Sequence, residues 1–328
     1  GNTITVDSEL IGGAAGDALT DADYNTVLGS NALSADTLGS QSTAVGFNAL
    51  ATQNFTTATN SLNTAVGYAA GLNVTTGTSN TLIGGIAGDA LTDADFNVAV
   101  GQGALSADTL GSRSTAIGRA ALSAQNFTTA TDTYNTAVGF HAGVNVTTGL
   151  FNTIVGAKAG DAFTSGNSNV AIGYNALTAD TLGDRAVAVG LNALAAQNFT
   201  TTTDNYNVGV GYQAGLAVTT GIYNTIIGGL AGDALTSGNN NTAVGTAALS
   251  TDTLGDRNVA LGVSALEQQN FTTSTDSYNV AVGYNVGLRV TTGIRNTLIG
   301  GQAGDALTDA DKNTVVGQGA LSADTLGS

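Results

Sequence analysis

Short apolar segments that end in glycine recur along the whole chain. A Val, Ile or Leu precedes each of these glycines, Thr or Val stands three positions before nearly all of them, and Asn stands four positions before most, as in residues 63–67. β-Branched residues in short alternating runs are typical of strands, whereas a helix needs apolar residues spaced by three and four over about ten positions. The pattern therefore predicts short strands in an all-β chain.

The glycines that end these segments define a period. Gly12, Gly29, Gly46, Gly67 and Gly84 follow one another at steps of seventeen, seventeen, twenty-one and seventeen positions, and the resulting four-coil repeat also spaces the motif A-G-D-A-L/F-T. A short repeat of this kind predicts a parallel β-solenoid, here with about eighteen coils of two or three strands each. We expect the glycine at a corner that needs a positive φ or a close backbone approach, and the Asn at another corner. Stacked at about 4.8 Å per coil, the coils would form a rod of roughly 85 Å.

Alternation divides each strand between two faces. We expect the residues one and three positions before the glycine, such as Val66 and Thr64, to line the interior, and the residue between them to point outward. That middle residue is also apolar, and in every fourth coil it is large, which predicts a lateral interface between copies of the chain. The predicted interface residues are Leu10, Leu82, Ile154, Ile226, Leu298, Ala65 and Ala137. The alternative is that each coil folds its own loop over this face.

The repeat motif resembles that of a known family. Asn63-Thr64-Ala65-Val66-Gly67 is similar to the head repeats of trimeric autotransporter adhesins of the YadA type, and similar repeats occur in phage tail fibres. The resemblance covers the chain from about Leu10 onward, although the coils of this chain are longer than those of that family. It implies a left-handed parallel β-roll, packed as a trimer, that is displayed outside a cell or virion and binds surfaces.

Composition excludes several classes of function. The chain has 46 Gly but no Pro, Cys, Met or Trp, and its 8 basic and 24 acidic residues give a formal charge of −16. This charge repels nucleic acid and anionic lipid, and no apolar stretch is long enough for direct membrane insertion. The single histidine, His141, lies at a position that varies between repeats, and no nucleophile motif is present. We therefore expect neither an enzyme nor a bound cofactor.

One acidic motif is a weak candidate for a calcium site. Asp89, Asp93 and Asp95 lie on one coil, and clustered carboxylates can hold Ca²⁺ through their oxygen atoms. The equivalent segments of the third and fourth repeats lose two of these three carboxylates. A solvated turn is the competing interpretation.

The four additional positions of each longer coil form a second candidate site. They belong to the segment Q-N-F-T-T, which predicts a projecting loop once per four-coil repeat, suited to multivalent attachment to surface glycans or matrix. The aromatic candidates are Phe55, Phe127, Phe199, Phe271, Tyr134, Tyr206 and Tyr278. The alternative is that these rings hold the longer loop against the solenoid. The same loops carry the sequons of Asn54, Asn126, Asn198 and Asn270, which are candidate glycosylation sites.

The two ends differ from each other. Residues 1–9 depart from the repeat and predict a segment that caps the first coil or exchanges with a neighbouring chain. Residues 10–328 form one continuous repeat domain that stops within a coil, where the repeat could continue or a second copy could stack.

Together these observations predict a non-catalytic segment of an extracellular fibre, adhesin or phage tail fibre that associates with copies of itself. A filament or sheath subunit that polymerises end to end is one alternative. An ice-binding solenoid is another, which is disfavoured because the repeated Thr is expected to point inward.

Overall fold

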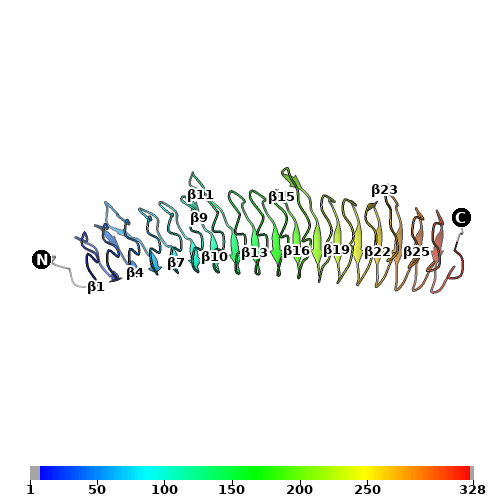
Figure 1. Cartoon of the computed structure of the whole chain (residues 1–328), viewed down its shortest axis with the longest axis horizontal. Coiled ribbons are helices and arrows are strands. Elements are labelled where there is room, and N and C mark those ends of the chain that lie inside the picture. The colour runs from blue at the N-terminus through cyan, green and yellow to red at the C-terminus, as the bar shows by residue number, and fades with distance from the viewer. Residues whose placement is uncertain (1–7, 326–328) are drawn as a thin grey trace. The chain divides into compact units, whose positions relative to one another are not determined.

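The computed structural model describes residues 8–325, and within this range the chain forms strands and turns but no helix. It divides into two compact units, Gly1–Ser165 and Gly166–Ser328. Each unit is a parallel β-solenoid with nine three-residue strands in its main sheet, which gives about eighteen turns in the described part of the chain (Figure 1). The predicted fold class is thus confirmed. No helix in residues 8–325 is long and apolar enough to cross a membrane.

The main sheet of each unit contains one strand from every turn. In the first unit these strands are β1 (Glu9–Ile11), β2 (Thr26–Leu28), β4 (Thr43–Val45), β6 (Thr64–Val66), β7 (Thr81–Ile83), β8 (Val98–Val100), β10 (Thr115–Ile117), β12 (Thr136–Val138) and β13 (Thr153–Val155). In the second unit they are β14 (Val170–Ile172), β16 (Val187–Val189), β18 (Val208–Val210), β19 (Thr225–Ile227), β20 (Thr242–Val244), β22 (Val259–Leu261), β24 (Val280–Val282), β25 (Thr297–Ile299) and β26 (Thr314–Val316).

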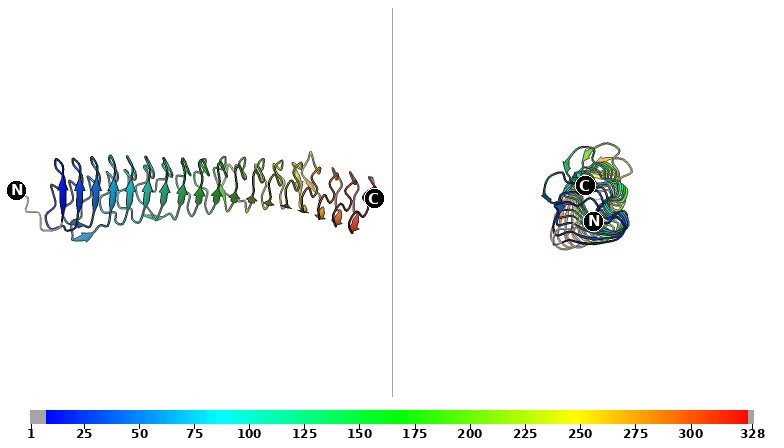
Figure 2. Two further views of the ribbon diagram at one scale, coloured as in Figure 1. Left: turned by 90° about the horizontal axis from the view of Figure 1, so that it is seen from below. Right: turned by 90° about the vertical axis from the view of Figure 1, so that its left-hand side faces the viewer.

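Successive strands of a unit pair in parallel and in register. Thr64 of β6 lies opposite Thr81 of β7, Ala65 opposite Leu82, and Val66 opposite Ile83. Figure 2 shows the same row of strands within each unit from a second direction. The first main strands begin at Glu9, Thr26, Thr43, Thr64 and Thr81, which confirms the predicted rhythm of three shorter coils and one longer coil.

The longer turns add a second, smaller pairing. Four pairs of two-residue strands form there: β3 (Gly39–Ser40) with β5 (Thr59–Asn60), β9 (Gly111–Ser112) with β11 (Thr131–Asp132), β15 (Gly183–Asp184) with β17 (Thr203–Asp204), and β21 (Gly255–Asp256) with β23 (Thr275–Asp276). The turns that take no part in these pairs contain a single strand, fewer than the two or three that the sequence predicts.

The glycine after each main strand, here called the strand glycine, is required for two reasons. Gly67 has a φ of +143°, and a Cβ on it would lie 2.5 Å from the carbonyl oxygen of Gly84 in the next turn. Such a contact is shorter than real Cβ atoms tolerate, and the φ value disfavours other residues. Both expectations from the sequence are confirmed at this corner.

The predicted orientation of the strands is wrong. Ala65, the middle residue of β6, is fully buried, whereas Thr64 and Val66 on either side are only half-buried. Because side chains alternate along a strand, a middle residue that points into the solenoid places its two neighbours on the outside. The Thr and Val ladders therefore line the outside of the solenoid.

The large residue in the middle of every fourth strand fills space inside the solenoid. A Cβ on Gly71 would lie 2.6 Å from Cδ1 of Leu82, and one on Gly88 would lie 2.7 Å from its Cδ2. In the two turns after Leu82 the middle residue is small, as at Ala99, and a buried leucine such as Leu105 occupies the position equivalent to Gly88. In the turn before Leu82 both positions are small, Ala65 and Gly71, and the side chain of Leu82 fills that space as well.

Buried asparagines link the turns through their side chains. The Nδ2 of Asn63 donates to the carbonyl oxygen of Gly77 over 2.7 Å, and its Oδ1 accepts the backbone N–H of Asn80 over 2.9 Å. The Asn stands at a corner, as the sequence predicts, but the residue with left-handed backbone there is its neighbour Leu62, with a φ of +54°. The Asn is required because its amide satisfies backbone groups that would otherwise be buried without partners.

The turn before each longer turn contains a buried carboxyl group. The Nε2 of Gln53 donates to Oδ2 of Asp36 over 2.6 Å, while Oδ1 of Asp36 accepts the backbone N–H groups of Gly39 and Phe55. The other three longer turns repeat the pair: Asp108 with Gln125, Asp180 with Gln197, and Asp252 with Gln269, each at 2.6 Å. These bonds attach the longer loop to the preceding turn.

We predict that Gly67→Ala lowers the free energy of unfolding by on the order of 3–5 kcal/mol, because the added methyl group combines backbone strain with an overlap against Gly84. The matched control is Gly85→Ala, where φ is ordinary and no atom lies within 4 Å of the added Cβ. That variant should stay within about 0.5 kcal/mol of the unmodified protein. Urea denaturation measures both, and equal losses would contradict the account of the strand glycine.

We predict that Asp180 and Asp252 make the folded state less stable as pH rises. Burial raises the pKa of both carboxyl groups, against the opposing hydrogen bonds from Gln197, Gln269 and the backbone. A raised pKa means that folding favours the protonated form, so this contribution to stability is present at acidic pH and is lost as pH rises through the raised pKa. The double variant Asp180→Asn, Asp252→Asn should gain stability relative to the unmodified protein across that window. Denaturation curves with the same pH dependence for both proteins would refute this.

Candidate functional site

The outward side of the main strands forms the most distinctive surface of each unit. Numbered from the strand glycine, it consists of the side chains at positions −5, −3, −1 and +1, which are exposed or half-buried in the described residues. Those at −4 and −2 are buried, except in the first and last turns. We call the four outward columns the outer strand face. Because one strand occurs per turn, each column repeats at the spacing of the turns, about 4.8 Å.

Large apolar side chains gather on this face. Among residues 8–325, every exposed large hydrophobic side chain except Leu230 and Leu321 lies in the columns at −5, −1 or +1. The members at −1 are aliphatic, such as Ile83 and Ile227, each 38% exposed, and the aromatic residues occupy −5 and +1. Contiguous exposed apolar patches of this kind mark interaction surfaces.

Charge divides this face from the remainder of the chain. Six of the eight basic residues lie on it: Arg113, Arg119, Arg185, Arg257, Arg295 and Lys312. Of the carboxylates in residues 8–325, only Glu9 is in one of the four columns. The outer strand face is therefore apolar to basic, in a chain whose formal charge is −16.

The column at −5 is a stack of planar side chains. In the first unit the guanidinium of Arg113 lies 5.0 Å from the ring centroid of Phe96 and 5.9 Å from that of Tyr134, whose ring stacks on Phe151 at 5.8 Å. Arg113 also pairs with Asp132 at 3.0 Å. Each contact of this kind is worth roughly 0.5–1.5 kcal/mol.

The second unit has the same column. Arg185 lies over Tyr206 at 5.6 Å, and Tyr206 stacks on Tyr223 with 5.7 Å between centroids. Arg257 lies over Tyr278 at 5.5 Å. Arg185 and Arg257 form ion pairs with Asp204 and Asp276, which stand two positions before the tyrosines. We call this column the planar ladder.

The column at +1 carries further aromatic residues. Phe47 stacks on Tyr68 at 5.7 Å in the first unit. Arg119 lies over Phe140 at 5.6 Å and contacts Nε2 of His141 at 3.0 Å. The only histidine of the chain thus belongs to this exposed cluster.

The predicted interface residues lie inside the solenoid. Leu82, Ile154, Ile226, Leu298, Ala65 and Ala137 are all 0% exposed, and Leu10, which is half-buried, packs toward Gly16. The prediction that they point outward is wrong, because their positions carry the side chains that fill the core. Any surface through which copies associate has to be formed by other side chains.

The predicted aromatic loop separates into two groups. Phe55, Phe127, Phe199 and Phe271 are only 5–7% exposed, so the prediction that they project from the loop is wrong. They hold the loop against the solenoid, which was the alternative interpretation. Tyr134, Tyr206 and Tyr278 are 47–51% exposed, but they belong to the planar ladder. The sequon residues Asn54, Asn126 and Asn198 are exposed and Asn270 is half-buried.

The predicted calcium candidates engage in contacts within the chain. Oδ1 of Asp95 accepts the backbone N–H of Thr78 over 2.6 Å, and Oδ1 of Asp93 accepts the hydroxyl of Thr76 over 2.7 Å. No group of three or more His, Cys, Asp or Glu side chains in residues 8–325 is arranged to hold a metal ion. Burial raises the pKa of Asp89, whose buried Oδ1 has no hydrogen-bond partner.

The predicted capping segment lies mainly outside the described residues. Its residues Ser8 and Glu9 are described, and Glu9 begins β1, which pairs with β2. Ser8 accepts the backbone N–H of Asn25 over 3.1 Å.

Comparison with known proteins does not assign the chain to a family. No family model matches the chain, and neither does any curated protein sequence. The function has to be inferred from the surface itself.

Reasoning from the sequence found Tyr134, Tyr206 and Tyr278 as candidates for a projecting loop, but it missed the arginines beside them and the column to which they belong. Their signal is present in the alignment on the strand glycine: position −5 holds Arg113, Arg185 and Arg257 in the third coil of successive repeats, and Tyr134, Tyr206 and Tyr278 in the fourth. The side chains at position −5 form a surface only if that face of the strand points outward. Because both faces of the strand are apolar, the sequence does not show which of them is exposed.

Proposed function

We propose that the chain is a non-catalytic structural segment of an extracellular fibre or adhesin, and that copies associate through the outer strand face. The observation that carries this proposal is the gathering of exposed Ile, Leu, Phe and Tyr side chains on the one face that is almost free of carboxylates. The extracellular setting rests on the resemblance to adhesin head and tail-fibre repeats. A trimer is the arrangement which that resemblance implies.

Charge favours a second copy as the occupant of this face. Elsewhere two copies would bring their carboxylates together, and like charges in contact are destabilising. On the outer strand face, apolar columns would meet apolar columns, and three of the arginines are already paired with Asp132, Asp204 and Asp276. Association through this face therefore buries apolar area without bringing unpaired carboxylates together.

Ice binding is a second candidate, because the structure reverses the reason for disfavouring it. The Thr ladder at position −3, including Thr225 and Thr242, lies on the outside of the solenoid. The face is less suited to ice than to another protein, because Val replaces Thr in several turns and Tyr and Arg side chains flank the ladder at −5 and +1.

The proposed association can be tested by introducing negative charge on the outer strand face. We predict that the unmodified chain sediments as a closed oligomer, and that Ile83→Glu, Ile227→Glu and Ile299→Glu together make it a monomer, because each substitution places a carboxylate on an exposed apolar column. The control introduces the same charge at the exposed loop residues Thr57, Thr129 and Thr201 and should remain associated.

Three outcomes contradict the proposal. A monomeric unmodified chain at tens of micromolar would exclude association through the face, and thermal hysteresis in that monomer would favour ice binding. Open polymers of variable length that the Glu variant still forms would favour a filament assembled end to end.

A further inference from the structure

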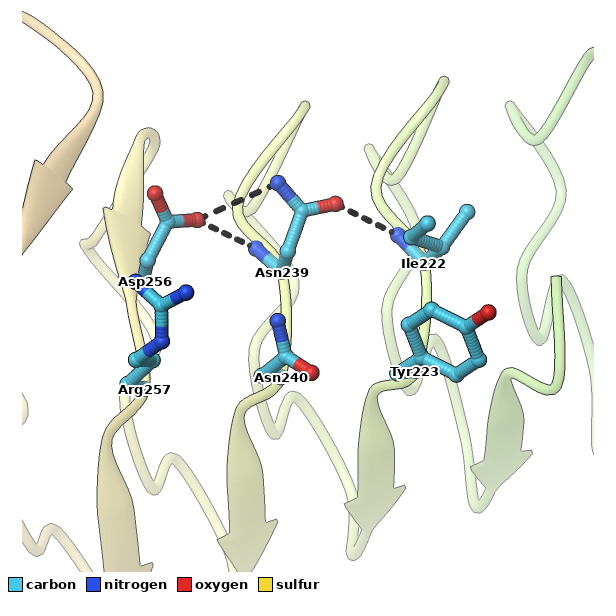
Figure 3. Close-up of a pocket in the computed structure, with 6 residues that line it drawn as sticks. All are labelled: Ile222, Tyr223, Asn239, Asn240, Asp256 and Arg257. Atoms are coloured by element: carbon cyan, nitrogen blue, oxygen red, sulfur yellow. Dashed lines mark hydrogen bonds between the residues drawn. The ribbon is translucent and has the colours of Figure 1, made fainter.

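The planar ladder of the second unit is interrupted between Tyr223 and Arg257. Position −5 is Tyr223 in one turn and Arg257 two turns later, and the turn between them has the short residue Asn240. Figure 3 shows the resulting pocket, with the Tyr223 ring and the Arg257 side chain on either side of Asn240. Two turn spacings amount to about 9.6 Å, which leaves room for one planar group between the two.

The polar groups behind this pocket are already bonded. Oδ1 of Asn239 accepts the backbone N–H of Ile222 over 2.9 Å, and Oδ1 of Asp256 accepts the backbone N–H of Asn239 over 2.6 Å (Figure 3). Oδ2 of Asp256 accepts the hydroxyl of Ser274 over 2.9 Å. The pocket therefore offers a ligand two planar side walls, and it does not require a charged partner.

The charge of Arg257 is also compensated. Its guanidinium pairs with Asp276 and lies over Tyr278 on the side away from Asn240. A group that enters beside Arg257 would meet a guanidinium already neutralised by a carboxylate. An electron-rich ring suits such a wall better than an anion does, because the attraction between cation and ring needs no compensating charge.

We propose that this pocket receives an aromatic side chain, tyrosine or phenylalanine, from a second copy of the chain. The inference rests on the proposed association through the outer strand face and specifies one of its contacts. Neighbouring members of the ladder in the second unit lie 5.5–5.7 Å apart, so a ring inserted between Tyr223 and Arg257 would make stacking contacts of the kind that the chain itself uses. The face supplies rings to donate, since Tyr212 is 55% and Tyr284 is 60% exposed.

A substitution at position 240 can fill the pocket with a side chain of the same chain. At the equivalent position of earlier repeats stand Tyr24 and Phe96, with φ values of 60° and 59°, and Asn240 has a φ of 58°. Asn240→Tyr should therefore fold and complete the ladder between Tyr223 and Arg257. The matched control is Asn240→Ser, because serine is the native residue at this position in another repeat, Ser168, with a φ of 58°.

The experiment measures association by sedimentation equilibrium for the full chain and both variants. We expect Asn240→Tyr to weaken association roughly ten-fold, because the new ring blocks the pocket and the contact of the partner's ring with Tyr223 and Arg257 is lost. Asn240→Ser should leave association unchanged. Equal association of all three proteins would overturn the inference while leaving the proposed function intact. A monomeric unmodified chain would instead refute the proposed function.

A second arm separates a neighbouring copy from a free aromatic ligand. p-Cresol is titrated into the monomeric variant Ile83→Glu, Ile227→Glu, Ile299→Glu, with and without Asn240→Tyr, and the backbone amide signal of the neighbouring Asn241 is followed by NMR. Saturable binding that Asn240→Tyr abolishes, together with unchanged association of Asn240→Tyr, would assign the pocket to a small aromatic molecule and overturn the second copy as its occupant. Weakened association of Asn240→Tyr supports the proposal.

Discussion

Within each unit, successive turns have to place their strands in register on one another, and the structure follows from that constraint. The parallel ladder fixes one backbone path for the turns of a unit, including the corner where the strand glycine approaches its counterpart. At Gly67 the next carbonyl oxygen would lie 2.5 Å from a Cβ, so no larger residue fits without moving the turns apart. An insertion is accommodated only where the path can bulge outward. The longer turns bulge on the side away from the main strands, where their strand β11, or its equivalent, pairs with β9 of the preceding turn (Figure 1).

A fixed path also fixes the volume enclosed by each turn. Leu82 fills the space that Gly71 and Gly88 leave open, and in the two turns that follow it a leucine such as Leu105 fills the equivalent space. Polar groups in the interior obey the same restriction. Asn63 bonds the backbone of the adjoining turn, and Asp36 bonds Gln53 together with two backbone N–H groups, so nearly all interior polar side-chain atoms in residues 8–325 have partners within reach.

The repeat made the fold and the rhythm of its turns predictable, because the strand glycine and the β-branched residues before it occur in every coil. The orientation of the strands was not predictable in the same way. Both faces of each strand are apolar, and the expectation that residues such as Thr64 and Val66 point inward fails because the middle residue, Ala65, occupies the interior. That reversal moved the predicted interface from the column of Leu82 to the columns on either side of it. The buried Phe127 was misassigned for a related reason, since an aromatic ring in a loop can serve either as a contact for a partner or as an anchor for the loop.

The central claim is that the middle residue of each strand points inward while its two neighbours form an exposed surface on which copies meet. The chain has no cysteine, so single substitutions can report on each position separately. The most direct measurement is the rate of thiol labelling of Thr26→Cys, Val27→Cys and Leu28→Cys in the folded protein, at dilutions where copies dissociate. Rapid labelling at 26 and 28 with protection at 27, and protection at all three as concentration rises, is the result that the account predicts. Rapid labelling at 27 with protection at 26 and 28 would contradict it.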